Sequence, residues 1–153
     1  MRKALVALAL VLGDALAQSV ELVSLSSETR AATWSQTLQG QGLWTYQAEL
    51  RYAAPASGTY KVLVQVVPAG AHGLTLRGYL TPGTPTRVSG SGALGSLAFT
   101  GRTLMPSTYQ TLLQGVGNVQ GHLPLTLELE AQAQGPLPPG YLFLQVNVVM
   151  MPE

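Results

Sequence analysis

The sequence predicts an all-β protein, an antiparallel β-sandwich of the immunoglobulin-like or pilin-like kind with about eight strands, after an N-terminal signal peptide. Two observations predict this class. Apolar and polar residues alternate with a period of two along several segments, and the segments between them are rich in the chain's 17 Gly and 10 Pro residues. Alternation of this kind puts successive side chains on opposite faces of a strand. Because we find no credible long helix, the strands are expected to stack as two sheets.

Residues 1–17 predict a cleaved signal peptide. Arg2 and Lys3 form a short positive region, residues 4–12 are an unbroken apolar run, and residues 15–17 read Ala-Leu-Ala, the small-x-small pattern of a cleavage site. The apolar run is about half of the roughly 20 residues that a spanning helix needs, so a retained membrane anchor is the weaker alternative. Cleavage before Gln18 would leave residues 18–153 as a single domain, exported to the periplasm, the cell surface or the extracellular medium.

The mature part of the chain is expected to be electrically neutral. Removing Arg2, Lys3 and Asp14 from eight basic and seven acidic residues leaves six of each. Such a chain has little attraction for nucleic acid or an anionic membrane, and its copies repel one another weakly. We therefore expect protein partners, including self-association, with no nucleic acid and with membrane contact only during export. Since the chain has no Cys, its stability must come from packing and strand pairing.

In chain order, the first strands are expected at residues 19–25 and 32–39. Clear alternation follows in 43–52, which ends before a turn at 55–58, and in 59–67, which Pro68, Ala69 and Gly70 should end. A further strand at 73–80 would turn its Leu residues inward and Tyr79 outward. Weaker patterns predict strands near 85–89, 96–104 and 108–114.

The strongest alternation lies near the end of the chain. In residues 122–132, apolar side chains alternate with polar ones, and the same pattern returns from Leu142 to Met150. The connector 135–140 reads Gly-Pro-Leu-Pro-Pro-Gly and can be neither a helix nor a central strand. We predict that the two strands pair as an antiparallel hairpin with a stiff, proline-rich loop.

Residue types that carry chemistry are scarce. The mature part has no Asp, and its two His residues, His72 and His122, lie far apart, whereas a zinc site needs three or four ligands. Glu128 and Glu130 would project from one strand face, as a glycosidase-like acid–base pair could, but their neighbours Thr126 and Gln132 are typical of a solvated sheet surface. We therefore expect no catalytic residue, no metal and no cofactor.

Several apolar residues fall on faces that the alternation turns outward. Tyr79 and Phe143 are the aromatic ones, and Leu63, Val67 and Val149 accompany them. Contiguous apolar side chains on an outer face usually mark an interaction surface. Trp44, Tyr46 and Tyr52, by contrast, share an inward face and are expected to pack in the core.

The order of segments resembles that of secreted bacterial pilin-type β-sandwich subunits, in particular the spore-coat-U-like fimbrial group. The matching features are a signal peptide followed directly by SVELVSL (19–25) and a closing turn and strand, PLPPGYLFLQVNVVM (136–150). The resemblance implies that residues 18–25 act as a donor strand for a neighbouring subunit, with Val20 and Leu22, or Val23 and Leu25, filling its groove. The alternative is that this segment pairs within its own domain.

These observations favour an exported, non-enzymatic structural or assembly protein of the cell envelope or surface, of the filament or fimbrial-subunit kind. The alternative is a secreted β-sandwich module that binds a ligand or a carbohydrate through exposed Trp34, Tyr79 or Tyr109. An enzyme is the third and weakest hypothesis.

Overall fold

A computed structural model describes residues 18–23, 29–34, 40–70, 74–133, 135 and 140–153. Their regular secondary structure consists of β-strands, and none of these residues belongs to a helix long and apolar enough to cross a membrane. The strands are β1 (Ser19–Val23), β2 (Thr29–Trp34), β3 (Gln41–Ala54), β4 (Tyr60–Ala69), β5 (Thr75–Pro82), β6 (Thr86–Gly90), β7 (Ser96–Leu97), β8 (Thr103–Met105), β9 (Gln110–Val116), β10 (Val119–Gln132) and β11 (Gly140–Pro152).

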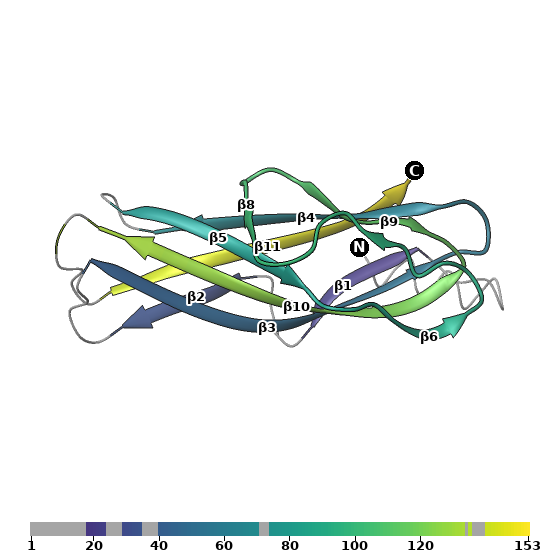
Figure 1. Cartoon of the computed structure of the whole chain (residues 1–153), viewed down its shortest axis with the longest axis horizontal. Helices are drawn as coiled ribbons and strands as arrows, with labels where there is room; N and C mark the ends of the chain where they lie inside the picture. Colours follow the sequence, from purple (N-terminus) through teal and green to yellow (C-terminus); the bar gives the residue numbers. More distant parts are fainter. Residues whose placement is uncertain (1–17, 24–28, 35–39, 71–73, 134, 136–139) are drawn as a thin grey trace.

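The strands form two antiparallel sheets that lie face to face (Figure 1). Sheet A has the order β1-β3-β10-β5-β8, and β6 pairs with the start of β10, beyond the point where β5 ends. Sheet B has the order β2-β11-β4-β9-β7. The predicted all-β antiparallel sandwich is therefore confirmed.

The core lies between the sheets and is filled by the apolar half of each alternating segment. Buried side chains come chiefly from β10 and β3 in sheet A and from β4 and β11 in sheet B, and they include Leu123, Leu125, Leu127, Leu129, Leu50, Val62, Val64, Val66, Leu142, Leu144 and Val146. Each of these is at most 1% exposed. The period of two therefore identified the buried face of every long strand correctly.

The predicted hairpin between residues 122–132 and 142–150 is wrong. β10 lies in sheet A, where it pairs with β3, β5 and β6, whereas β11 lies in sheet B between β2 and β4. The chain passes from one sheet to the other between these two strands. Alternation cannot reveal this, because strands of opposite sheets both turn their apolar face toward the same core.

Several strand boundaries also differ from the predicted ones. β4 continues through Pro68 instead of ending before it, because β9 pairs with β4 only as far as Val64 and the missing N–H of Pro68 interrupts no ladder on that side. The segment 96–104 contains β7 and the start of β8, which belong to different sheets. β2 begins three residues before the predicted 32, while residues 24–28 and 35–39, and with them Leu25, lie outside the described part.

The N-terminal segment pairs within its own chain. β1 lies beside the second half of β3, where Val20 faces Tyr52 and Leu22 faces Leu50, and Val20 is 6% exposed. The amide of Gln18 also donates to the carbonyl oxygen of Met150 in the other sheet. A donor role for Val20, Leu22 and Val23 stays a prediction. For it to occur, β1 would have to leave β3 of its own chain and make the same contacts with β3 of a neighbouring copy.

Candidate interaction surfaces

The outer faces of the two sheets differ in charge. The strands of sheet A carry Glu21, Glu49, Arg51, Arg77, Arg87, Glu128 and Glu130. Among the described side chains of the sheet B strands there is one charged residue, Lys61. Because charged side chains must remain in water, the outer face of sheet A is the more hydrated of the two among the side chains that the structure describes.

We define the sheet B face as the outward side chains of β4 and β11. Leu63 faces Val149 in the pairing of these strands, and Phe143 is the diagonal neighbour of Val67, whose direct partner is Gln145. Phe143 is 39% exposed and Met151, at the end of β11, is 40% exposed. The structure therefore assembles four of the outward apolar residues that the sequence singled out, and it adds Met151.

Three polar side chains interrupt the sheet B face: Gln145, which is exposed and faces Val67, and the paired Gln65 and Asn147. The side-chain amide of Asn147 donates to Gln65 Oε1 at 3.0 Å, and Gln65 Nε2 donates to the carbonyl oxygen of Ser107 at 2.9 Å. The two side chains thus use part of their hydrogen-bonding capacity on each other and on the backbone. A partner that covers this face would therefore meet a polar spot that is already partly satisfied.

Tyr79 does not join this face, because β5 belongs to the other sheet. Its ring lies under the guanidinium of Arg102, 3.6 Å from ring centroid to Cζ, and its hydroxyl donates to Glu130 Oε1 at 3.3 Å. A cation over a ring occupies the surface on which a sugar would stack. Tyr79 and Phe143, which the sequence grouped together, therefore lie on different sheets, and the ring of Tyr79 is already covered by Arg102.

The carboxylates beside Tyr79 are engaged by cations. Arg102 Nε donates to Glu128 Oε1 at 2.7 Å, and Arg77 Nη1 lies 3.5 Å from Glu130 Oε1. The side chains of Glu128 and Glu130 are 15% and 13% exposed, so the strand surface is less solvated here than we expected. The hydrogen bond to Glu128 raises the pKa of Arg102 above its usual value. This is the arrangement of a structural ion-pair network.

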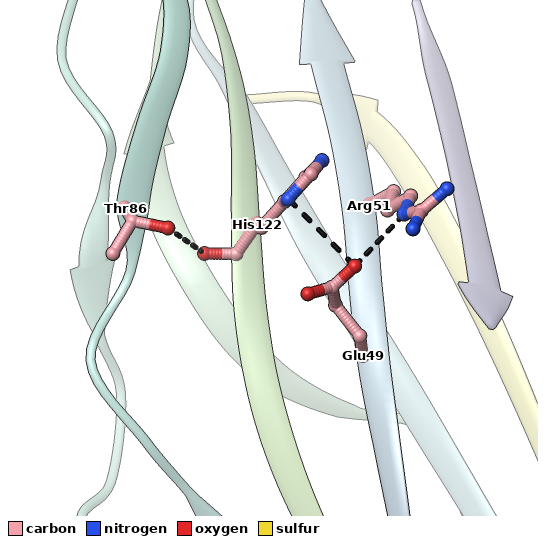
Figure 2. A network of polar contacts seen from close by, with 4 residues as sticks. All are labelled: Glu49, Arg51, Thr86 and His122. Carbon is pink, nitrogen blue, oxygen red and sulfur yellow. Dashed lines mark hydrogen bonds and ion pairs between the residues drawn. The ribbon is translucent and has the colours of Figure 1, made fainter. Parts of the chain in front are cut away.

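A second polar cluster joins β3, β10 and β6 (Figure 2). Glu49 Oε2 accepts a hydrogen bond from Arg51 Nε at 2.8 Å and lies 3.7 Å from His122 Nδ1, while Thr86 Oγ1 donates to the carbonyl oxygen of His122 at 3.5 Å. The hydrogen bond from Arg51, and then the charges of His122 and Arg51, hold the pKa of Glu49 below its usual value. Exposed pairs of this kind contribute little to stability.

The described residues show no place for a metal ion. They contain no group of three or more His, Cys, Asp or Glu side chains that could hold one. His122 has a single carboxylate nearby, that of Glu49, and His72 lies outside the described part of the chain.

A shallow groove of about 300 Å³ lies where β4, β5 and β8 meet. Its lining is partly apolar, from Pro68, Leu76, Leu104 and Met105, and partly polar, from Arg77 and Ser107, and Gly78 also forms part of it. A Cβ atom on Gly78 would come 2.7 Å from Val66 Cγ1, so the glycine allows the two sheets to approach closely here. The sequence carried no signal for this groove, because its lining depends on strands of both sheets.

The remaining aromatic candidates do not form a stacking surface among the described side chains. Tyr109 is 45% exposed and precedes β9 of sheet B, whereas Tyr79 lies on sheet A. The side chain of Trp34 is not described. Sequence reasoning also missed Arg102, since nothing in its neighbourhood indicates that it meets Glu128, 26 residues further along the chain.

No family model and no curated protein match the sequence. Among solved structures, the chain is similar to TmCBM61 in complex with β-1,4-galactotriose, at 10% identity and a TM-score of 0.32. The match covers 89% of this chain and 88% of the other. Function is therefore inferred from the residues of this chain alone.

Proposed function

We propose that this chain is an exported, non-enzymatic binding domain that assembles with another protein through the sheet B face. The observation that carries the proposal is the difference between the two outer faces. Seven charged residues lie on the strands of sheet A, whereas the sheet B face keeps Leu63, Val67, Phe143, Val149 and Met151 partly in water beside a single charge, Lys61. Several apolar residues on one face with few charges, around polar side chains that are partly satisfied, are typical of the buried centre of a protein interface.

The free energy expected from burying these side chains is large enough for an assembly surface. Burying a large apolar side chain completely stabilises an association by about 1.5–3 kcal/mol, and these side chains are already covered in part by their neighbours. Each therefore has on the order of 1 kcal/mol left to contribute when a partner covers it. Phe143 and Met151 contribute most, because they are the most exposed.

Three features of the sequence support the same function. The signal peptide predicted at residues 1–17 would direct the domain out of the cytoplasm, and the resemblance of segments 19–25 and 136–150 to fimbrial subunits supports a role in assembly. The balanced charge of the mature part also favours assembly, because copies without net charge repel one another only weakly.

The test is the assembly state of the native protein after extraction from the cell, measured by gel filtration and electron microscopy. We expect an assembly much larger than the 16.1 kDa chain. Phe143→Glu should dissociate it, while Val88→Glu, at a residue that is 50% exposed on sheet A, should leave it intact. Circular dichroism of both variants confirms that they fold. A native monomer, or equal effects of the two variants, would contradict the proposal.

A second candidate is a carbohydrate-binding module that uses the outer face of sheet A. The observation in its favour is that Gln47, Thr126 and Thr81 lie opposite one another across β3, β10 and β5, next to the Tyr79–Arg102 pair. Thr126 Oγ1 donates to Gln47 Oε1 at 3.0 Å. Calorimetry against a glycan panel tests it, with Gln47→Ala as the variant expected to weaken any binding. A panel without any response would end this candidate.

A further inference from the structure

Most sheet edges in the described part of the chain are protected against pairing with another chain. Edge strands usually avoid such pairing by being short, by carrying Pro or charge, or by being covered. β7 has two residues, β8 has three and is followed by Pro106, and the unpaired end of β4 contains Pro68. β1 has five residues, including the charged Glu21. β2 pairs with β11 only at residues 140–145, and beyond them the side-chain amide of Gln18 donates to the carbonyl oxygen of Met150.

The first half of β3 has none of these protections among the residues that the structure describes. β10 pairs with one edge of β3 along its whole length, but β1 pairs with the other edge only at residues 49–53. Over residues 41–48, which we call the open edge, no strand of the described chain pairs with that other edge. The open edge reads Gln-Gly-Leu-Trp-Thr-Tyr-Gln-Ala and contains neither charge nor Pro. Its register with β10 is continuous, so no bulge bends it away.

The backbone of the open edge is oriented for pairing. The N–H of Ala133, next to the end of β10, donates to the carbonyl oxygen of Gly40 at 2.9 Å, so the even-numbered residues of β3 direct their backbone groups toward β10. Backbone groups alternate between the two sides of a strand, so the odd-numbered residues 41, 43, 45 and 47 direct theirs toward the open edge. An added strand would find four N–H and four C=O groups in a line of about 24 Å.

Side chains along the open edge are also suited to an interface. Trp44 and Tyr46 pack against the core from the inner side of the strand and are only partly buried, and Leu43 on the outer side is 50% exposed. A strand laid beside them would cover more of all three. Trp and Tyr are among the residues that contribute most at protein interfaces.

We propose that the open edge of β3 pairs with the open edge of a second copy of this chain, antiparallel and about a two-fold axis, so that sheet A continues from one copy into the other. A two-fold interface must be complementary to itself. An uncharged strand satisfies this condition, because antiparallel pairing with its own copy brings no like charges together. The dimer uses sheet A and leaves the sheet B face uncovered, so this inference stands or falls separately from the proposed function.

The sharpest test removes one outward N–H without touching the ladder to β10. Thr45→Pro does this, and Thr45→Val is the matched control because it keeps the N–H. Sedimentation equilibrium of the purified protein should show a dimer for the wild type and for Thr45→Val. The dissociation constant should rise by about tenfold or more in Thr45→Pro. A monomeric wild type at all accessible concentrations, or a Thr45→Pro dimer as stable as that of the control, would overturn the proposal.

A second pair of variants covers the case in which Thr45→Pro does not fold. Leu43→Lys puts a charge on the open edge, whereas Leu104→Lys puts the same charge on the same outer face at the opposite edge, where Leu104 is 53% exposed. Only Leu43→Lys should weaken the dimer. Equal behaviour of the two variants would count against the open edge as the contact.

Cross-linking gives an independent readout, because the chain contains no Cys and a single introduced thiol is unambiguous. Under mild oxidation, Thr45→Cys should yield a covalent dimer. Thr126→Cys, which faces the same way from the central strand β10, should not. Phe143→Glu should leave this dimer unchanged, which separates it from any assembly through the sheet B face. Cross-linking at both positions, or at neither, would refute the pairing.

Discussion

Tyr52 makes the stability of this protein depend on alkaline pH in a way that one substitution can isolate. Its side chain lies on the inner face of β3, is 1% exposed, and donates from its hydroxyl to the carbonyl oxygen of Leu94 at 2.9 Å. Burial raises the pKa of Tyr52 from 10.0 to about 12, because the phenolate would lose its hydration. A difference of about two pKa units corresponds to about 2.7 kcal/mol between the two protonation states.

The sign follows from which state binds the proton more tightly. The folded protein holds the phenolic proton more tightly than the unfolded chain does, so this stabilisation is complete below about pH 10 and is lost as the pH rises through about 12. By about pH 11.5 the wild type should have lost about 2 kcal/mol through this residue.

Tyr52→Phe removes the titrating group but keeps most of the ring packing. In urea unfolding at about pH 9, the variant should be less stable than the wild type by about 1 kcal/mol, because the Leu94 carbonyl loses its donor. Between about pH 9 and pH 11.5 this difference should shrink and then reverse, since only the wild type carries the loss calculated above. Tyr109→Phe, whose phenol is 45% exposed, is the control. Parallel stability curves for wild type and Tyr52→Phe would refute the reasoning.

Three further predictions concern packing and charge. Gly78→Ala should reduce the free energy of unfolding by about 1–3 kcal/mol, because its Cβ would lie 2.7 Å from Val66 Cγ1; Gly135→Ala, which meets nothing within 4 Å, should change it by less than about 0.5 kcal/mol. Leu127→Ala, at a fully buried position in β10, should cost about 2–5 kcal/mol in the same urea titration. Glu49→Gln should make the free energy of unfolding fall less steeply with acid. The pKa of Glu49 is lower in the folded protein than in the unfolded chain, so its carboxylate stabilises the fold at a pH above the unfolded pKa, and this contribution is lost as the pH falls. The same dependence on acid pH in the variant and the wild type would contradict this.

The sequence predicted the buried faces well, because side-chain direction along a strand is a local property. Leu123 through Ala131 alternate in the sequence, and the same residues line the core in the structure. The outward apolar residues Leu63, Val67, Phe143 and Val149 were identified in the same way, although the alternation did not show that they would meet on one face.

Alternation by itself thus determined the fold class, the inward face of each long strand and the set of outward apolar side chains. Only the tertiary structure decided which strands pair. It placed β10 and β11 in different sheets, put Tyr79 and Phe143 on opposite faces of the sandwich, and, within the described part of the chain, paired residues 41–48 of β3 with β10 alone. The physical reason is that a side chain's face follows from its position along its own strand, whereas pairing depends on where the connecting segments carry the chain. Backbone hydrogen bonds form between residues of any type, so they leave no pattern in the sequence from which the partner could be read.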